Sequence, residues 1–284
     1  MPKIKFHIGD FGLTNSISKN LVNLIKKKPN LINGISIVVN TNKNIQFWLR
    51  KILRINNKIQ INLHINLVDG KPLSKKLKKI INKDGYLKTG FLKLLLIKLN
   101  PNFDIYKHEV KKEIEEQLKK YLKLLEKINY KKSKLIYLDS HQHLHMVPWI
   151  FDLILELSKK YKIVFVRSIK EPFILSNLSN FFKIWFYKNL LKYLVLKILN
   201  IYNSKKIIKT NINTNKFFYG VINSGHMNKR YVEKICQNKK GEYQVLLHPN
   251  IGNKNEKNIF GNKNKLKYYL SDDRINELNF LIKN

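Results

Sequence analysis

The sequence predicts an α/β fold, in which the strands of a parallel sheet alternate with helices. Short runs rich in β-branched and aromatic residues recur along the chain, and stretches with the apolar spacing of helices lie between most of them. No linker rich in proline, glycine or serine divides the chain, and we find no internal repeat. At 284 residues the chain is long enough for one large domain. Alternation of this kind is typical of a (β/α) barrel or of an open parallel sheet.

Each expected strand is a short β-rich run, and the seven runs are, in order, Ile4–Ile8, Ile35–Val39, Ile59–Leu67, Lys134–Leu138, Lys162–Val166, Phe217–Ile222 and Tyr243–Leu247. Helical spacing predicts four helices, over Leu13–Lys28, His108–Ile128, Trp149–Lys160 and Tyr231–Asn238. Two segments, about 70–107 and 173–210, carry few strand signals and are expected to be helical inserts. Within the second, the lysines at 183, 188, 192 and 197 predict a basic stripe on an amphipathic helix over 181–202.

The chain is strongly basic, with 55 Lys and Arg against 19 Asp and Glu and a net charge of +36. Such a charge favours a polyanionic partner, either a nucleic acid or an anionic membrane. Only five of the basic residues are arginine, the residue that makes most bidentate contacts in nucleic-acid readers. The lysines are spread along the whole chain, and Asn and Ile are also abundant, as AT-rich coding would produce. We therefore expect no specific nucleic-acid partner, while peripheral membrane contact through 181–202 stays open.

Cys236 is the only cysteine, which excludes a disulfide framework and a thiolate metal cluster and fits a reducing cytosol. The first residues lack the apolar core of a signal peptide, and no later stretch offers about eighteen uncharged apolar residues. We therefore expect a cytoplasmic protein. The sequence does not determine the oligomeric state, so a homo-oligomer also stays open.

Four groups of polar residues are expected at the carboxyl ends of strands, where functional groups gather in α/β folds. They are Gly9 to Gly12 with Asp10, then His64, then Asp139 with His141, His143 and His145, and finally His248. If the stretch YLDSHQHLHMVP is extended, its three histidines point to one side of the backbone. Such a cluster favours a metal site, a proton-transfer site or a solvated surface.

One carboxylate and two imidazoles from different strand ends make a usable site for a divalent cation. This donor set suits zinc, manganese or cobalt, and magnesium more weakly. The ion would polarise a carbonyl oxygen, and a further histidine could donate a proton to a leaving group. Structural alternatives exist for each residue alone, because a carboxylate after a strand often caps a helix and a histidine within a strand is often structural.

The sequence resembles the YdjC-like carbohydrate deacetylases, also called the ChbG/HpnK family, across nearly its full length. The segments that carry the resemblance are DFGLTNSI (10–17), LHINLVDGKPL (63–73), LDSHQHLHMVPWIF (138–151), VRSIKEP (166–172), SGHM (224–227) and LLHPN (246–250). The resemblance implies a TIM-barrel-like (β/α) barrel, with residues 1–284 forming a single deacetylase domain. It also implies metal-dependent removal of an acetyl group from an N-acetylated sugar, either a chito-oligosaccharide or a lipid-linked N-acetylglucosamine.

The resemblance also implies roles for individual residues. The metal ligands would be Asp10, His64 and His141, holding one divalent ion, which is Mg²⁺ by resemblance with Zn²⁺ or Co²⁺ as alternatives. His248 would be the general acid for the leaving amine. His143 and His145 would line or brace the substrate site, and Arg167 would bind sugar hydroxyls or the carbonyl of the substrate.

The sequence departs from the family pattern at Gly9, where the family usually has an aspartate that acts as general base. Three explanations stay open: Asp139 or His7 substitutes, the metal-activated water needs little help, or the enzyme is impaired. Loss of a general base typically costs about 10²–10⁴-fold in rate. The alternative to an active deacetylase is therefore an impaired homologue that binds sugar or metal without turnover.

Overall fold

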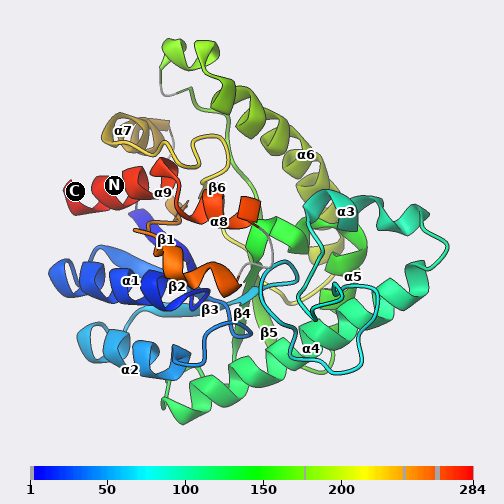
Figure 1. The fold of residues 1–284 in the computed structure, drawn as a ribbon. Coiled ribbons are helices and arrows are strands. Elements are labelled where there is room, and N and C mark those ends of the chain that lie inside the picture. Colours follow the sequence, from blue (N-terminus) through cyan, green and yellow to red (C-terminus); the bar gives the residue numbers. More distant parts are fainter. Residues whose placement is uncertain (1–2, 176, 239–240, 260–262, 284) are drawn as a thin grey trace.

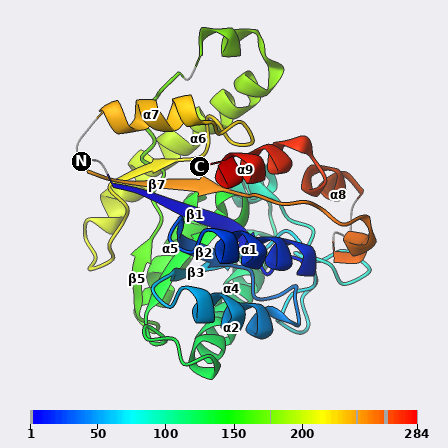
Figure 2. The same ribbon diagram turned by 90° about the vertical axis from the view of Figure 1, so that its left-hand side faces the viewer.

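A computed structural model describes residues 3–175, 177–238, 241–259 and 263–283 (Figure 1). Its centre is a sheet of seven strands in the order β5-β4-β3-β2-β1-β7-β6, in which every neighbouring pair is parallel. The strands are β1 (Lys3–Phe11), β2 (Ile32–Ile37), β3 (Gln60–Ile65), β4 (Ile136–Ser140), β5 (Ile163–Val166), β6 (Phe217–Tyr219) and β7 (Glu242–Leu247). Strands β1 and β7 run side by side although they lie at opposite ends of the chain (Figure 2).

The two outer strands of the sheet are brought together by a short segment before β6. The backbone N–H of Val166 in β5 donates to Asn213 O at 3.0 Å, and Asn213 N donates to Val164 O at 2.9 Å. The side chain of Asn215 adds two hydrogen bonds to the backbone of Ser168, each 2.8 Å long. The sheet therefore curls into a barrel-like form, which confirms the predicted TIM-barrel-like α/β architecture.

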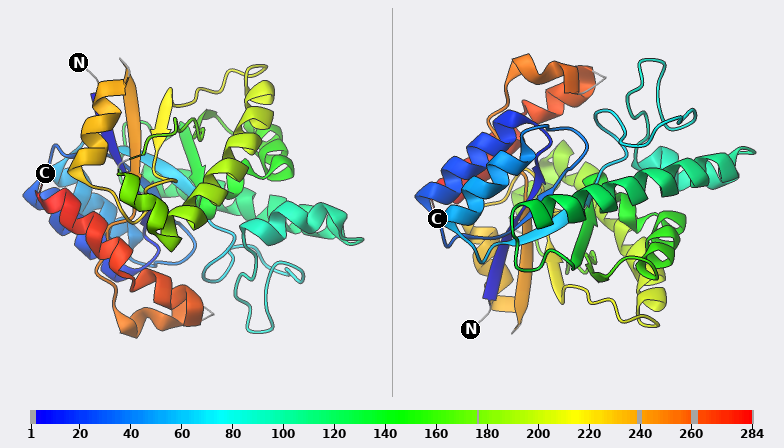
Figure 3. Two further views of the ribbon diagram at one scale, coloured as in Figure 1. Left: turned by 90° about the horizontal axis from the view of Figure 1, so that it is seen from above. Right: turned by 90° about the horizontal axis from the view of Figure 1, so that it is seen from below.

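Helices cover the outside of the curled sheet. They are α1 (Asn15–Lys27), α2 (Ile45–Ile55), α3 (Phe91–Leu96), α4 (Phe103–Lys127), α5 (Pro148–Ser158), α6 (Ile184–Ile207), α7 (Lys229–Asn238), α8 (Lys263–Tyr269) and α9 (Asp272–Lys283). Short 3₁₀ helices are η1 (Ile97–Leu99), η2 (His141–Met146), η3 (Leu178–Phe182) and η4 (Lys254–Ile259). Seen from above and below, α1 and α2 lie next to each other against the sheet (Figure 3). None of the described helices is long and apolar enough to cross a bilayer.

Each of the seven expected strands and four expected helices is present, with bounds that differ by a few residues. Helix α2 was not among the expected helices, although it buries Ile45, Leu49 and Ile52 at helical spacing. The expected basic stripe is wrong in part. The helix begins after Lys183. Lys192 lines a cavity whereas Lys188 and Lys197 do not, and all three side chains are exposed.

Two buried carboxylates of α4 hold the irregular segment that follows β3. Glu109 accepts hydrogen bonds from the backbone N–H groups of Lys78, Lys79 and Ile80 at 2.8 to 3.1 Å. One turn later, Glu113 accepts from the backbone of Leu73 and Ser74. These bonds satisfy backbone donors that no sheet or helix pairs, and they position the chain that leads to α3.

Replacing Glu109 with alanine is expected to lower the free energy of unfolding by about 2–4 kcal/mol, because three hydrogen bonds to a charged acceptor are lost. Denaturant unfolding measures the change. Glu126→Ala, at an exposed position near the end of the same helix, is the matched control and should change stability by less than about 0.5 kcal/mol. Equal effects of both substitutions would contradict the role given to Glu109.

Candidate metal centre

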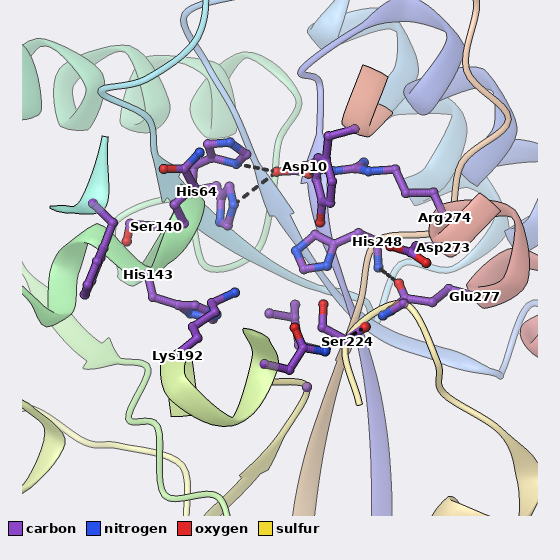
Figure 4. A pocket seen from close by; sticks show the side chains of 18 of the residues that line it. Asp10, His64, Ser140, His143, Lys192, Ser224, His248, Asp273, Arg274 and Glu277 are labelled. Atoms are coloured by element: carbon purple, nitrogen blue, oxygen red, sulfur yellow. Dashed lines mark hydrogen bonds and ion pairs between the residues drawn. The ribbon is translucent and has the colours of Figure 1, made fainter. Parts of the chain in front are cut away.

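A cavity of about 510 Å³ opens at the carboxyl ends of the strands. Asp10, His64, His141 and His248 line it from the ends of β1, β3, β4 and β7, as the sequence analysis expected. Helices α6 and α9 close other sides of the cavity, through residues such as Lys192 and Glu277. Figure 4 shows the side chains of His64, His143, His248 and Lys192 directed toward the same space.

Asp10 is the buried carboxylate of the cluster. Its backbone has a φ of 59°, in the left-handed region that aspartate tolerates better than most residues, and this turns the side chain into the cavity wall. Oδ1 lies 2.8 Å from His141 Nδ1, and Oδ2 lies 2.5 Å from Arg274 Nη2. Burial alone would raise the pKa of Asp10, but His141 and Arg274 outweigh it and hold the pKa well below its ordinary value. Asp10 is therefore ionised.

His64 is held from behind by a carboxylate. Its Nδ1 lies 2.5 Å from Asp139 Oδ1. Its Nε2 lies 3.4 Å from Asp10 Oδ1 and has no hydrogen-bond partner among the described residues. Burial would lower the pKa of His64, but the two carboxylates outweigh burial and raise the pKa. A buried imidazole nitrogen that makes no hydrogen bond but lies beside a carboxylate oxygen is the arrangement expected of a ligand whose ion completes the site.

His141 completes the cluster at the start of η2. Its Nε2 lies 3.2 Å from Asp69 Oδ2 and 3.3 Å from the hydroxyl of Tyr269. Burial would lower its pKa, but Asp10 and Asp69 raise the pKa to about 9. One candidate ligand atom from each of Asp10, His64 and His141 lies within 4.8 Å of the others. The three residues could therefore hold one metal ion.

Metal binding is expected to strengthen with pH. In the metal-free protein at pH 7 the raised pKa keeps His141 protonated, and a cation must displace that proton. The affinity should rise about tenfold per pH unit for each proton released, at pH values below the raised pKa of about 9. Calorimetric titration with Zn²⁺ or Mg²⁺ in buffers of different ionisation enthalpy measures the proton release. An affinity that does not change over this range would contradict the role of His141 as a ligand.

The three clustered histidines do not share one side of the backbone, so that expectation is wrong. Gln142 and His143 have φ values of 52° and 56°, and these left-handed residues turn the chain sharply after His141. His143 lines the cavity and lies edge-on to Phe218. His145 points behind the site, where Nδ1 lies 2.6 Å from Ser140 Oγ and Nε2 lies 3.0 Å from the carbonyl of Arg167.

Asp139 and Arg167 form a buried pair beneath the cluster. Arg167 Nη1 lies 2.6 Å from Asp139 Oδ2, and both side chains are fully buried. Burial opposes ionisation of Asp139, but Arg167 and His64 hold its pKa far below the ordinary value. Neither residue lines the cavity, and His7, which lies 2.6 Å from Ser36 Oγ, does not line it either. In this arrangement Asp139 orients His64, and Arg167 balances the charge of Asp139.

His248 lies above Gly9, and its ring would have to move to make room for a side chain at position 9. A Cβ atom at Gly9 would lie 2.6 Å from Nε2 and 2.7 Å from Cδ2 of the His248 ring. Glu277 of α9 holds this residue in place by accepting its backbone N–H at 2.5 Å. Burial lowers the pKa of His248 to about 3, so its imidazole is neutral at pH 7.

The structure adds residues that the sequence analysis missed. Asp69 and Tyr269 contact His141, Arg274 contacts Asp10, and Glu277 holds the backbone of His248. Asp69 follows a strand within the segment 63–73, and Arg274 is one of only five arginines, so each carried a signal. Arg274 and Glu277 lie on α9, and no sequence pattern predicted that α9 packs at the carboxyl end of β1.

Comparison with known proteins identifies the family of the chain. The family model described as YdjC-like protein matches residues 3–284. A carbohydrate deacetylase from Danio rerio is 26% identical over 177 residues, and one from Xenopus laevis is 29% identical over 173 residues. These matches cover 60% and 58% of this chain and 51% of each relative, so they span about half the length of the relatives. A carbohydrate deacetylase from Clostridium beijerinckii is 24% identical over 163 residues, covering 57% of this chain and 58% of the relative.

The fold also has a counterpart among solved structures. A protein from Enterococcus faecalis, proposed to cleave cellobiose phosphate, superimposes with a TM-score of 0.62. The superposition covers 99% of this chain and 90% of the other, at 16% sequence identity. At this level of identity, the superposition shows a shared fold and no more.

Proposed function

The chain belongs to the YdjC-like protein family, and from this membership we propose that it is a metal-dependent carbohydrate deacetylase. It would hydrolyse the acetamide of an N-acetylated sugar to acetate and a free amine. The observation that carries the proposal is the convergence of three candidate ligands and a neutral imidazole on one cavity, namely Asp10, His64, His141 and His248. The names of the curated relatives support the same reaction.

The donor set of Asp10, His64 and His141 fits one divalent cation, since His64 Nε2 is buried beside Asp10 without a hydrogen bond of its own. Such a cation supplies positive charge that polarises the acetamide carbonyl when it is bound. Asp139 keeps His64 in the tautomer that leaves Nε2 toward the site, while Asp69 and Tyr269 orient His141. Mg²⁺ is the ion that family resemblance favours, and Zn²⁺ and Co²⁺ suit the same donors.

The single imidazole of His248 would perform both proton transfers of the reaction. Position 9 offers no carboxylate, and neither Asp139 nor His7 lines the cavity. His248 lines the cavity, so its imidazole is placed to accept a proton from the attacking water. It would then donate that proton to the amine nitrogen as the carbon–nitrogen bond breaks. One proton taken from water and one given to the amine balance the reaction.

The alternative function is a homologue that binds sugar or metal without turnover, which the glycine at position 9 motivates. It predicts ligand binding without acetate release. Both readings place an acetylated sugar in the cavity, either a chito-oligosaccharide or the sugar of a glycolipid.

Acetate release from di-N-acetylchitobiose and from an N-acetylglucosamine glycolipid tests the proposal. The purified chain is treated with a chelator, and Mg²⁺, Zn²⁺ or Co²⁺ is then added back separately. We expect acetate release that chelation stops and one of the ions restores. Stoichiometric metal with no acetate from either substrate would favour the binding homologue. A chain that binds no metal would overturn the deacetylase proposal, and one that binds neither metal nor either sugar would overturn both hypotheses.

A further inference from the structure

The helix α6 is apolar on two opposite sides. Its inner side is buried against the rest of the protein through Phe186, Tyr193, Leu196 and Ile207. Its outer side carries seven exposed apolar residues, Ile184, Tyr187, Leu191, Leu194, Ile198, Ile201 and Ile208, the last just after the helix. Their exposed fractions run from 48% for Leu194 to 80% for Ile208. We call these seven residues the outer stripe.

The outer stripe is continuous, because its members follow one another at three- and four-residue spacing through Ile201. A helix of 24 residues is about 36 Å long, so the stripe extends over several turns. Just before the helix, Leu178 and Phe182 of η3 are 73% and 89% exposed and lengthen the apolar surface. Figure 1 shows α6 along the outer edge of the molecule. Contiguous apolar surface of this kind marks a docking site.

The charged residues of the segment that carries the outer stripe are all basic, and one of them, Lys206, pairs with Asp152 of α5. No Asp or Glu lies between Glu171 and Glu233, whereas this segment contains nine lysines and one arginine. At about 100° per residue, Lys188 and Lys197 fall on opposite borders of the stripe. Lysines in these positions can bury their methylene stems beside apolar surface and extend their ammonium groups to phosphates. The surface therefore complements an anionic, apolar partner.

A bilayer fits this surface better than a second copy of the chain. Pairing two outer stripes would bring the lysine borders of both copies together, with no carboxylate on either helix to offset them. The net charge of +36 adds repulsion between copies. No described helix can cross a bilayer, so α6 would lie in the plane of the interface, as basic amphipathic helices do.

We propose that the outer stripe of α6 docks the protein on an anionic lipid bilayer. The apolar side chains enter the boundary between headgroups and acyl chains, while Lys188 and Lys197 contact lipid phosphates. On its other side α6 lines the cavity, through Asn189, Lys192 and Leu196. A helix is about 10 Å across, so docking places the cavity about one helix diameter from the membrane. If the proposed function holds, this position favours acetylated sugars carried on lipids.

Co-sedimentation of the whole chain with vesicles tests the proposal. Vesicles of phosphatidylcholine alone are compared with vesicles of phosphatidylcholine and phosphatidylglycerol at low and physiological salt. We expect binding to the anionic vesicles. The double variant Leu191→Asn, Ile198→Asn should bind about tenfold more weakly or worse, because buried apolar area is lost. The double variant Lys188→Gln, Lys197→Gln should lose about tenfold, chiefly for anionic vesicles.

Matched control variants on α4 distinguish binding through the outer stripe from non-specific apolar and electrostatic binding. Ile105→Asn removes an exposed apolar residue from α4, where Ile105 is 47% exposed, and should leave vesicle binding unchanged. The double variant Lys107→Gln, Lys123→Gln removes two exposed charges from α4 and should have less effect than the same change on α6. Circular dichroism confirms that each variant is folded.

Two results would overturn the proposal. One is wild-type protein that does not bind anionic vesicles, or stripe variants that bind them as wild type does. The other is a dimer, seen by analytical ultracentrifugation, that the stripe variants dissociate, because a second copy would then cover the surface. Acetate release from soluble di-N-acetylchitobiose should be the same in wild type and stripe variants. Failure of docking is thereby distinguished from failure of the deacetylase proposal.

Discussion

Replacing His64 with alanine should remove bound metal and lower acetate release by about 10³-fold or more, because charge stabilisation by the ion is worth several kcal/mol. Its Nε2 is buried beside Asp10 and has no hydrogen-bond partner among the described residues, so the substitution removes a candidate ligand. It also leaves Asp139 without the imidazole that lies 2.5 Å away. Metal content is measured by elemental analysis after dialysis, and turnover by acetate release.

His108→Ala is the control for this substitution. His108 lies exposed on α4, away from the cavity lining, and its loss should change neither metal content nor turnover. A milder variant, Asp139→Asn, keeps the ligands and weakens only their support, so metal affinity should fall about 10–100-fold. If His64→Ala retains stoichiometric metal and full turnover, the cluster of Asp10, His64 and His141 is not the metal centre.

Replacing His248 with alanine should lower kcat by about 10²–10⁴-fold while metal binding is retained, because the proton-transfer group is lost and the ligands stay. Gly9→Ala should reproduce part of this loss without touching His248 chemically. A Cβ at Gly9 would lie 2.6 Å from the ring nitrogen Nε2, so the ring must move. A displacement of about 1 Å in a reacting group can cost about 10²-fold.

Gly90→Ala is the matched control for Gly9→Ala. An added Cβ at Gly90 meets no atom closer than 3.9 Å, and the backbone there is extended, so turnover should not change. Turnover of Gly9→Ala equal to wild type would show that the position of the His248 ring does not matter. The same close contact bears on Gly9→Asp, which restores the family's carboxylate. The aspartate can enter only if His248 shifts, so its effect combines a gained base with a displaced imidazole.

The barrel-like fold followed closely from the sequence, for a physical reason. Strands buried on both faces are apolar runs such as Tyr243–Leu247, and helices between them show the spacing of one buried stripe. Both signals depend only on residues close together in the sequence, so they can be recognised without knowing which distant residues pack nearby. The helix Ile45–Ile55 was missed although its buried residues have the same spacing.

The candidate metal ligands were also named from the sequence, since Asp10, His64 and His141 follow or end apolar strands and fall in segments that resemble the family. The residues that contact these ligands were not predicted from the sequence. Arg274 reaches Asp10 from a helix 264 positions later, and Asp69 and Tyr269 meet His141 from opposite parts of the chain. Contacts of this kind depend on how distant elements pack.

The sequence by itself determined the alternating strands and helices, the candidate ligands, the missing carboxylate at position 9 and the basic, apolar segment that forms α6. Only the tertiary structure decided which way the side chains face. The left-handed backbone at Gln142 and His143 directs the three nearby histidines to different sides, although their alternation in the sequence suggested one side. Arg167 is buried in a pair with Asp139 beneath the site. Packing likewise sets His248 over Gly9 and leaves one side of α6 exposed. The reason is that residue type and spacing are local properties, whereas orientation and exposure depend on neighbours distant in sequence.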